Sequence, residues 1–160
     1  MAVIELQTLI DAPRERVFDL SRSIDAHVDS SAGTDERPVG GVTSGLLGLG
    51  EDVTWEARHL GVRQRLRVKM TRLERPHYFE DTMLRGAFQR MRHDHWFEER
   101  DGRTLMKDRF EFASPFGLLG RFVDGIFLTG YMRRFLEQRN AHLKRMAESD
   151  EWRKYLEASI

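Results

Sequence analysis

The chain has 160 residues, with 26 basic and 26 acidic side chains, 40% hydrophobic residues and no cysteine. The length predicts a single domain with a substantial core, and the balanced charge argues against a dedicated nucleic-acid-binding protein, which is usually basic. The lack of cysteine excludes disulfides, thiolate metal sites and cysteine nucleophiles. The sequence shows no basic-then-apolar leader and no apolar run approaching about 18 residues, so we expect a soluble, cytoplasmic domain without stable membrane insertion.

The first fifty residues predict one strand, two short helices and a glycine-rich segment. Residues 3–10 have the composition of a strand, and Pro13 suits the start of a short helix. A second short helix is expected to start at Ser23 and to end by Gly33. Glycines crowd residues 40–50, but no Gly-Lys-Ser/Thr follows them. We therefore expect a flexible loop around a short strand, which could gate a cavity.

A period of two dominates residues 51–113 and, with successive turn signals, predicts about six strands after the two helices. The clearest strand begins at Val62, where basic side chains alternate with mostly apolar ones and would form a solvated outer face. Pro76 ends this strand because proline cannot donate to the ladder. Asp101 and Gly102 form a strong hairpin signal, and successive hairpins imply an antiparallel sheet.

Residues 114–148 predict one long C-terminal helix. Ser114 is a good N-cap and Pro115 suits the first helical position. Apolar side chains then recur at spacings of three, four and seven, the pattern of one buried helical face, at Leu128, Met132, Phe135, Leu136, Leu143 and Met146. Arg139 is assigned to the polar arc that remains. Residues 149–160 are expected to form a helical extension or a tail.

This order of elements resembles the helix-grip fold, the superfamily of START lipid-binding domains, birch-pollen-type allergens and polyketide cyclase/dehydrases. Three stretches reinforce the resemblance, which covers residues 1–148: IDAPRERVF from Ile10, GEDVTW from Gly50 and SPFG from Ser114. The last two are similar to a small bacterial ligand-binding or cyclase/dehydrase-like branch. The resemblance implies an α+β domain in which a curved antiparallel sheet of about six to seven strands wraps around the long helix. It also implies a cavity between sheet and helix that takes an apolar or amphipathic small molecule.

In such a fold the concave face of the sheet lines the cavity, so the parity of each strand decides which side chains reach it. We choose the parity that avoids burying unpaired charges. The inward positions are then Trp55 and His59, the even positions from Val62, and Phe79, Asp81 and Met83, followed by Met91, His93, His95 and Phe97, and by Met106, Asp108, Phe110 and Phe112. This assignment predicts a polar group on an otherwise apolar surface.

Four interpretations of this polar group remain open. Its histidines and aspartates could satisfy one another as a buried hydrogen-bond network, or they could orient the head of an apolar ligand. His93 and His95 could hold a metal ion, completed by His59 or a carboxylate. Either of these two histidines could also act with Asp81 or Asp108 as general acid and base.

The first part of the long helix, residues 116–128, is apolar nearly all round. It is interpreted either as buried between the sheet and the short helices, or as a wall and mouth of the cavity. Membrane docking is disfavoured because the segment lacks a lysine-rich polar face.

Together these patterns predict binding and transport of an apolar or amphipathic small molecule (a lipid, sterol or polyketide-like compound). We expect a monomer or homodimer with no cofactor and no metal. The alternatives are a cofactor-free cyclase, dehydratase or isomerase using the same cavity, and an interaction module whose cavity is filled by side chains. The predicted ligand-binding residues are Trp55, His59, Gln64, Asp81, Met83, Met91, His93, His95, Met106, Asp108, Phe110, Phe122 and Ile126.

Overall fold

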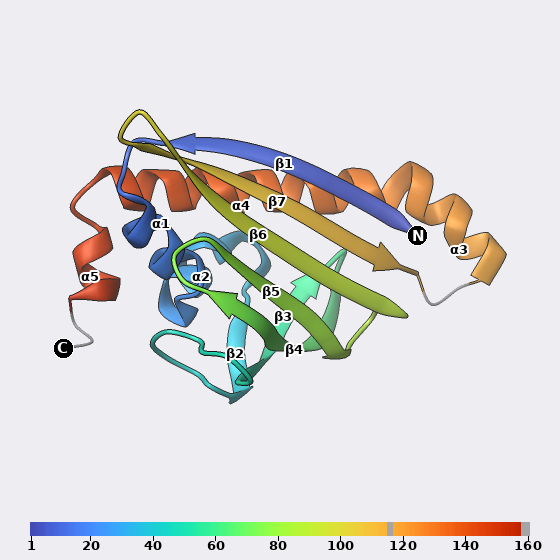
Figure 1. Ribbon diagram of the computed structural model, residues 1–160. Helices are drawn as coiled ribbons and strands as arrows, with labels where there is room; N and C mark the ends of the chain where they lie inside the picture. Colours follow the sequence, from blue (N-terminus) through green and yellow to red (C-terminus); the bar gives the residue numbers. More distant parts are fainter. Residues whose placement is uncertain (115–116, 158–160) are drawn as a thin grey trace.

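An antiparallel sheet of seven strands curves around a long C-terminal helix in the computed structural model, which describes residues 1–114 and 117–157 (Figure 1). The strand order is β1-β7-β6-β5-β4-β3-β2, so every neighbouring pair except β1 and β7 is also consecutive in sequence. This architecture confirms the predicted α+β helix-grip fold. The strands are β1 (Ala2–Ile10), β2 (Arg37–Gly41), β3 (Asp52–His59), β4 (Val62–Glu74), β5 (Tyr78–Arg85), β6 (Arg90–Arg100) and β7 (Arg103–Ala113).

Two short helices follow the first strand, as predicted. The second begins at its expected cap, because the Ser23 side chain accepts a hydrogen bond from the backbone N–H of Ala26 at 3.2 Å. One more short helix follows the long C-terminal helix. It packs against the first of the two short helices, and its Tyr155 is buried. The helices of these regions are α1 (Arg14–Ser21), α2 (Ile24–Ser30), a 3₁₀ turn (Ala32–Thr34) and α5 (Trp152–Leu156).

The long helix differs from the predicted single helix over residues 114–148. It consists of α3 (Gly117–Val123), a π-helical segment (Asp124–Leu128) and α4 (Thr129–Glu148). Gly125 lies inside the π-helical segment, where a glycine weakens regular α-helical geometry. Pro115, the expected first helical residue, lies outside the described residues. None of the helices in the described parts of the chain is long and apolar enough to cross a membrane.

Tight turns set the register of two hairpins. Asp101 and Gly102, the predicted turn, have φ angles of 52° and 78°, and Leu60 and Gly61 have φ angles of 53° and 77° between β3 and β4. Two successive positive φ angles are characteristic of the type I′ turn, whose twist matches that of the flanking strands.

The predicted parity of the strands is confirmed. Phe79, Phe97 and Phe112 are fully buried on the concave face, as are Val53 of β3 and Met70 of β4. The opposite face is not uniformly solvated, however. There Asp94 is fully buried, accepts hydrogen bonds from the Tyr78 hydroxyl and from the Arg92 guanidinium, and is therefore paired rather than isolated.

The core is made where α1 and the second half of α4 meet the concave sheet face. Phe18 of α1 is fully buried and packs edge-on against the rings of Phe79 and Phe97, with centroids 5.5 and 5.1 Å apart. Leu143 and Met146 of α4 are buried in the same core, which confirms the predicted apolar face of that helix.

Replacing Phe18 with alanine should lower the free energy of unfolding by about 3–5 kcal/mol, because it leaves a cavity among packed rings. Phe122→Ala removes the same atoms from a side chain that is 67% exposed, and should change the free energy by no more than about 0.5 kcal/mol. Urea denaturation followed by circular dichroism measures both. Equal losses in the two variants would contradict the described core.

Candidate functional site

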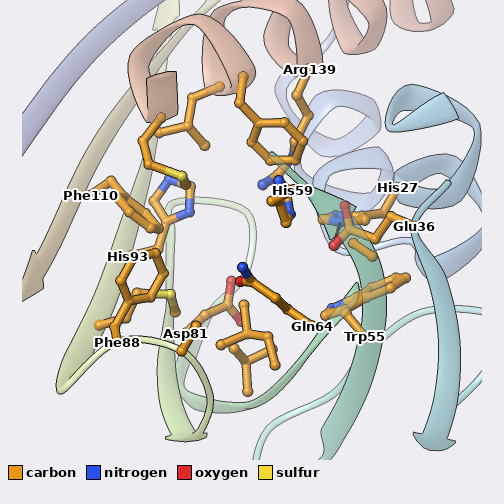
Figure 2. A pocket seen from close by; sticks show the side chains of 18 of the residues that line it. His27, Glu36, Trp55, His59, Gln64, Asp81, Phe88, His93, Phe110 and Arg139 are labelled. Atoms are coloured by element: carbon orange, nitrogen blue, oxygen red, sulfur yellow. Dashed lines mark ion pairs between the residues drawn. The ribbon is translucent and has the colours of Figure 1, made fainter. Parts of the chain in front are cut away.

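A cavity of about 490 Å³ lies between the concave face of the sheet and the helices α2 and α4 (Figure 2). Its walls are mostly apolar and come from β3 to β7, from the loop after β2, and from the first half of α4. The apolar and aromatic lining side chains include Leu47, Val53, Trp55, Leu66, Val68, Met70, Phe79, Phe88, Met91, Phe110, Leu128, Met132, Phe135 and Leu136.

The structure brings seven of the predicted residues to the wall of this cavity: Trp55, His59, Gln64, Asp81, Met91, His93 and Phe110. Parity correctly predicts which face of the sheet they occupy. It cannot predict how much of that face remains uncovered, because this depends on where the helices pack.

Five other predicted residues do not belong to the described lining, and the reason is visible for most of them. Met106 is covered by α1, where the Ser21 hydroxyl lies 3.7 Å from its sulfur. His95 lies under the ring of Phe79 at a centroid distance of 4.2 Å, and Asp108 lies behind the histidines. Met83 lies near Gly86, close to the end of β5.

Phe122, expected in the lining, is instead a largely exposed residue of α3. The position of the Ile126 side chain lies outside what the structure describes.

The histidines and aspartates form a buried network centred on Asp108. One oxygen of Asp108, Oδ1, lies 3.0 Å from Nε2 of His93 and 3.0 Å from Nδ1 of His95. Its other oxygen accepts a hydrogen bond of 2.7 Å from the side-chain amide of Asn140, on α4. Nε2 of His95 lies 3.4 Å from Asp81. Sequence analysis did not identify Asn140, the residue that links this network to the helix.

The network divides its protons unequally. Burial and the neighbouring charge of His95 lower the pKa of His93 to about 4. Burial also opposes the charged form of His95, but hydrogen bonds to Asp108 and Asp81 outweigh this effect and raise the pKa of His95. Burial would raise the pKa of Asp108, but both histidines hold it well below its usual range. These directions make Asp108 the ionised group of the network and favour the proton on His95 rather than on His93.

This geometry favours the hydrogen-bond network over the metal interpretation. His93, His95 and Asp108 each offer a ligand atom, all within 4.8 Å of one another. Both histidine rings, however, already face the same carboxylate oxygen of Asp108, so a metal ion would have to replace these two contacts. His59, considered as a further ligand, instead pairs through Nδ1 with the Tyr131 hydroxyl at 2.8 Å.

A second polar group lines the opposite wall and was missed in the sequence. Nε2 of His27 lies 3.1 Å from Oε1 of Glu36, and the His27 ring stacks on Trp55 with centroids 4.1 Å apart. Burial would raise the pKa of Glu36, but the charges of His27 and Arg139 outweigh burial and lower it, so Glu36 is ionised. Burial lowers the pKa of His59, whose ring is therefore neutral near pH 7.

The assignment of Arg139 to the polar, solvent-facing arc of the long helix is wrong. It lines the cavity and extends from α4 toward the middle of the space (Figure 2). The signal was present in the sequence: Met132, Leu136, Arg139 and Leu143 follow one another at spacings of four, three and four. This spacing places Arg139 inside the apolar stripe rather than beside it.

Comparison with known proteins shows the family and agrees with the fold. The model of the family described as polyketide cyclase / dehydrase and lipid transport matches residues 1–148. The chain belongs to this family. No curated protein matches the sequence.

Solved structures with the family's fold resemble the chain over nearly its whole length. The protein TTHA0849 of Thermus thermophilus has a TM-score of 0.75 and 15% identity, covering 91% of this chain and 97% of its own. A START superfamily protein of Mycobacterium smegmatis has a TM-score of 0.67 and 11% identity, covering 91% and 97%. Ginseng major latex-like protein 151 of Panax ginseng has a TM-score of 0.70 and 10% identity, covering 92% and 98%. At these identities the likeness shows the fold alone.

The proton distribution of the network can be measured by NMR titration of the histidine side-chain nitrogens. We expect His93 to stay neutral down to about pH 4 and His95 to stay protonated above its ordinary pKa near 6.5. Asp108→Asn should bring the pKa of His95 to about 6.5 or lower, because burial then outweighs the remaining carboxylate. It should also lower the free energy of unfolding by about 3 kcal/mol or more.

Asp94→Asn is the matched control, since Asp94 is buried on the opposite face of the same sheet. It should leave both histidine titrations unchanged. A His95 that titrates at its ordinary pKa in the wild-type protein would contradict the described network.

Proposed function

We propose that this protein binds an apolar or amphipathic small molecule in the cavity between the sheet and α4 and carries it in a form shielded from water. The observation that supports this most is the cavity itself, about 490 Å³ of space with a predominantly apolar lining. This volume is within the range of ligand pockets, which is about 300–1,000 Å³. Family membership and the START-like fold agree with such a role.

The energy available for binding comes mainly from removing apolar surface from water. Each buried methylene contributes about 0.8 kcal/mol, so a chain of about ten carbons gains roughly 8 kcal/mol before the costs of association. Polar side chains are a minority of those that line the cavity. A hydrocarbon chain or ring system is thus the part of a ligand that the cavity suits best.

A mouth for such a ligand lies at the start of α4. Phe127 and Leu60 line the cavity and are also 55% and 56% exposed, so they belong to the wall and to the surface at once. Leu118, Leu119 and Phe122 of α3, which precedes the π-helical segment, are exposed apolar side chains as well. We propose that ligands pass between α4 and the turn that joins β3 to β4.

The acid–base alternative has weaker support. A general base works best when its pKa is near the working pH, and the pKa of His93 is lowered to about 4. His95 is the stronger base, but the rings of His93 and Phe79 lie against it, with centroids 3.8 and 4.2 Å away. Both features favour ligand binding over proton transfer to or from a substrate.

Filling the cavity should abolish binding without unfolding the protein. Ala57 lines the cavity, so Ala57→Phe places a ring in the ligand space and should weaken the binding of diphenylhexatriene by about tenfold or more. This hydrocarbon probe fluoresces when it leaves water for an apolar site, and its titration gives the dissociation constant directly.

Ala141→Phe adds the same ring on the exposed side of α4 and serves as the control. It should leave the affinity within about twofold of wild type, since it does not reach the cavity. Thermal unfolding of both variants verifies that they are folded. A wild-type protein that does not bind the probe, or an Ala57→Phe variant that binds it normally, would overturn the proposal.

A further inference from the structure

The turn that joins β3 to β4 carries exposed apolar side chains at the proposed mouth of the cavity. Leu60 and Val62 flank Gly61 in this turn, and both are more than half exposed. Leu60 also lines the cavity, as does the exposed Phe127. Single exposed apolar residues are common, but here two of them border the same space and a third follows in the same turn, which marks a surface that meets another apolar phase.

This turn lies beside the start of α4. Its neighbour His59 pairs with the Tyr131 hydroxyl at 2.8 Å and packs edge-on against the ring of Phe135, with centroids 5.3 Å apart. Val62 is the cross-strand partner of His59, and residues directly opposite each other point to the same face of an antiparallel sheet. Val62 therefore lies on the cavity side of the hairpin, next to the helix.

The outer face of the same hairpin is basic. Arg58 and Arg63 form the next cross-strand pair after the turn, and both are exposed. Arg58 makes no ion pair with any residue that the structure describes. Glu56 pairs with three arginines at once, at N–O distances of 2.9 to 3.1 Å: Arg37, Arg63 and Arg65. One negative charge thus faces three positive ones, which leaves an excess of positive charge close to the apolar turn.

This excess continues along β4. Arg67 pairs with Asp52 at 2.8 Å, whereas Lys69 makes no ion pair within the described part of the chain. Asp35 acts on Arg37 and adds one more negative charge, so the face remains positive. The outward positions of β3 and β4 carry five basic and two acidic side chains, namely Arg58, Arg63, Arg65, Arg67 and Lys69 against Asp52 and Glu56.

An apolar turn flanked by arginines is complementary to the surface of an anionic bilayer. Arginines pair with lipid phosphates, while apolar side chains enter the boundary between headgroups and hydrocarbon. The first part of the long helix lacks a lysine-rich polar face, and in the folded protein the hairpin supplies the basic side chains instead. An acidic protein would also pair with the arginines, but it gives no reason for the apolar residues to border the cavity.

We propose that the turn between β3 and β4, with Phe127 beside it, docks on the surface of an anionic phospholipid bilayer. The inference rests on the proposed binding function and adds the partner with which the cavity exchanges its ligand, because an apolar molecule can then pass between bilayer and cavity without crossing water. A second copy of the chain is a poor occupant of this surface, since two copies meeting there would bring their arginines together.

The test is sedimentation of the purified protein with vesicles of two compositions, phosphatidylcholine alone and phosphatidylcholine mixed with phosphatidylglycerol. We expect the wild-type protein to bind the mixed, anionic vesicles and to bind the neutral ones much more weakly. Added sodium chloride should weaken binding to the anionic vesicles, because salt screens attraction between exposed charges.

Two variants separate the apolar from the basic contribution. Arg58→Gln/Arg63→Gln should weaken binding to anionic vesicles by about tenfold or more, since each arginine near such a surface contributes about fivefold. Val62→Ser should weaken it by about fivefold, because the apolar contact is lost. None of these three side chains lines the cavity, so both variants should bind diphenylhexatriene in vesicle-free solution with wild-type affinity.

The turn between β6 and β7 provides the matched controls at the opposite end of the sheet (Figure 1). It also has two successive positive φ angles and an exposed arginine on each side. Arg100→Gln/Arg103→Gln removes the same charges there, and Leu9→Ser removes an exposed apolar side chain of β1 near that turn. Both controls should bind anionic vesicles within about twofold of wild type.

The two levels of proposal fail in different ways. If the wild-type protein binds diphenylhexatriene but not anionic vesicles, the docking inference is wrong, the binding function stands, and the basic face is left for an acidic protein. Equal losses in the test variants and their controls would also overturn the docking site. If anionic vesicles bind through this turn but diphenylhexatriene does not bind, the docking site stands and the binding function is wrong.

Discussion

The carboxylate of Asp108 is the interaction on which the interior of this protein depends. It lies on β7, receives two histidines from β6 and an amide from α4, and is almost completely buried. A charge in such a place is tolerated only when every oxygen is hydrogen-bonded and a counter-charge is close, and here protonated His95 supplies that charge. Because Asn140 takes part, the network also fixes the position of the long helix over the sheet.

Asn140 marks a division along α4. After it, Leu143, Met146 and Ala147 are buried in the core with α1 and the sheet. Before it, Tyr131, Met132, Phe135, Leu136 and Arg139 face the cavity. The same helix thus closes the core with its second half and spans an open space with its first half, while the sheet continues beneath both.

The two polar groups of the cavity differ in how completely they are satisfied. In the network of His93, His95 and Asp108, most polar atoms have partners inside the protein. These internal hydrogen bonds are enough to explain the network as a structural element of the fold. Glu36 is paired through Oε1 only, and Arg139, which lines the cavity, has no partner among the described residues. Nε2 of His95 also lacks a hydrogen-bond partner there, so a missing partner alone does not mark a residue as available to a ligand.

Local patterns in the sequence determined the elements and the faces of the sheet. The alternation from Val62 and the Asp101-Gly102 turn predicted strands and a hairpin, and the cost of burying unpaired charges selected the inward set on β6. The apolar spacing after Leu128 predicted the buried face of α4. These properties depend on neighbours within a few residues, so they can be read along the chain.

Only the tertiary structure decided which inward residues meet the cavity and which are covered. Parity treats Met106, His95 and His93 alike, yet the packing of α1 covers the first, the ring of Phe79 covers the second, and the third remains on the wall. The pairing of His27 with Glu36 and the position of Arg139 on the wall of the same cavity bring together residues from distant parts of the chain, which no local period encodes. The sequence determined the surfaces that could enclose a ligand, and long-range packing determined where the space between them was left open.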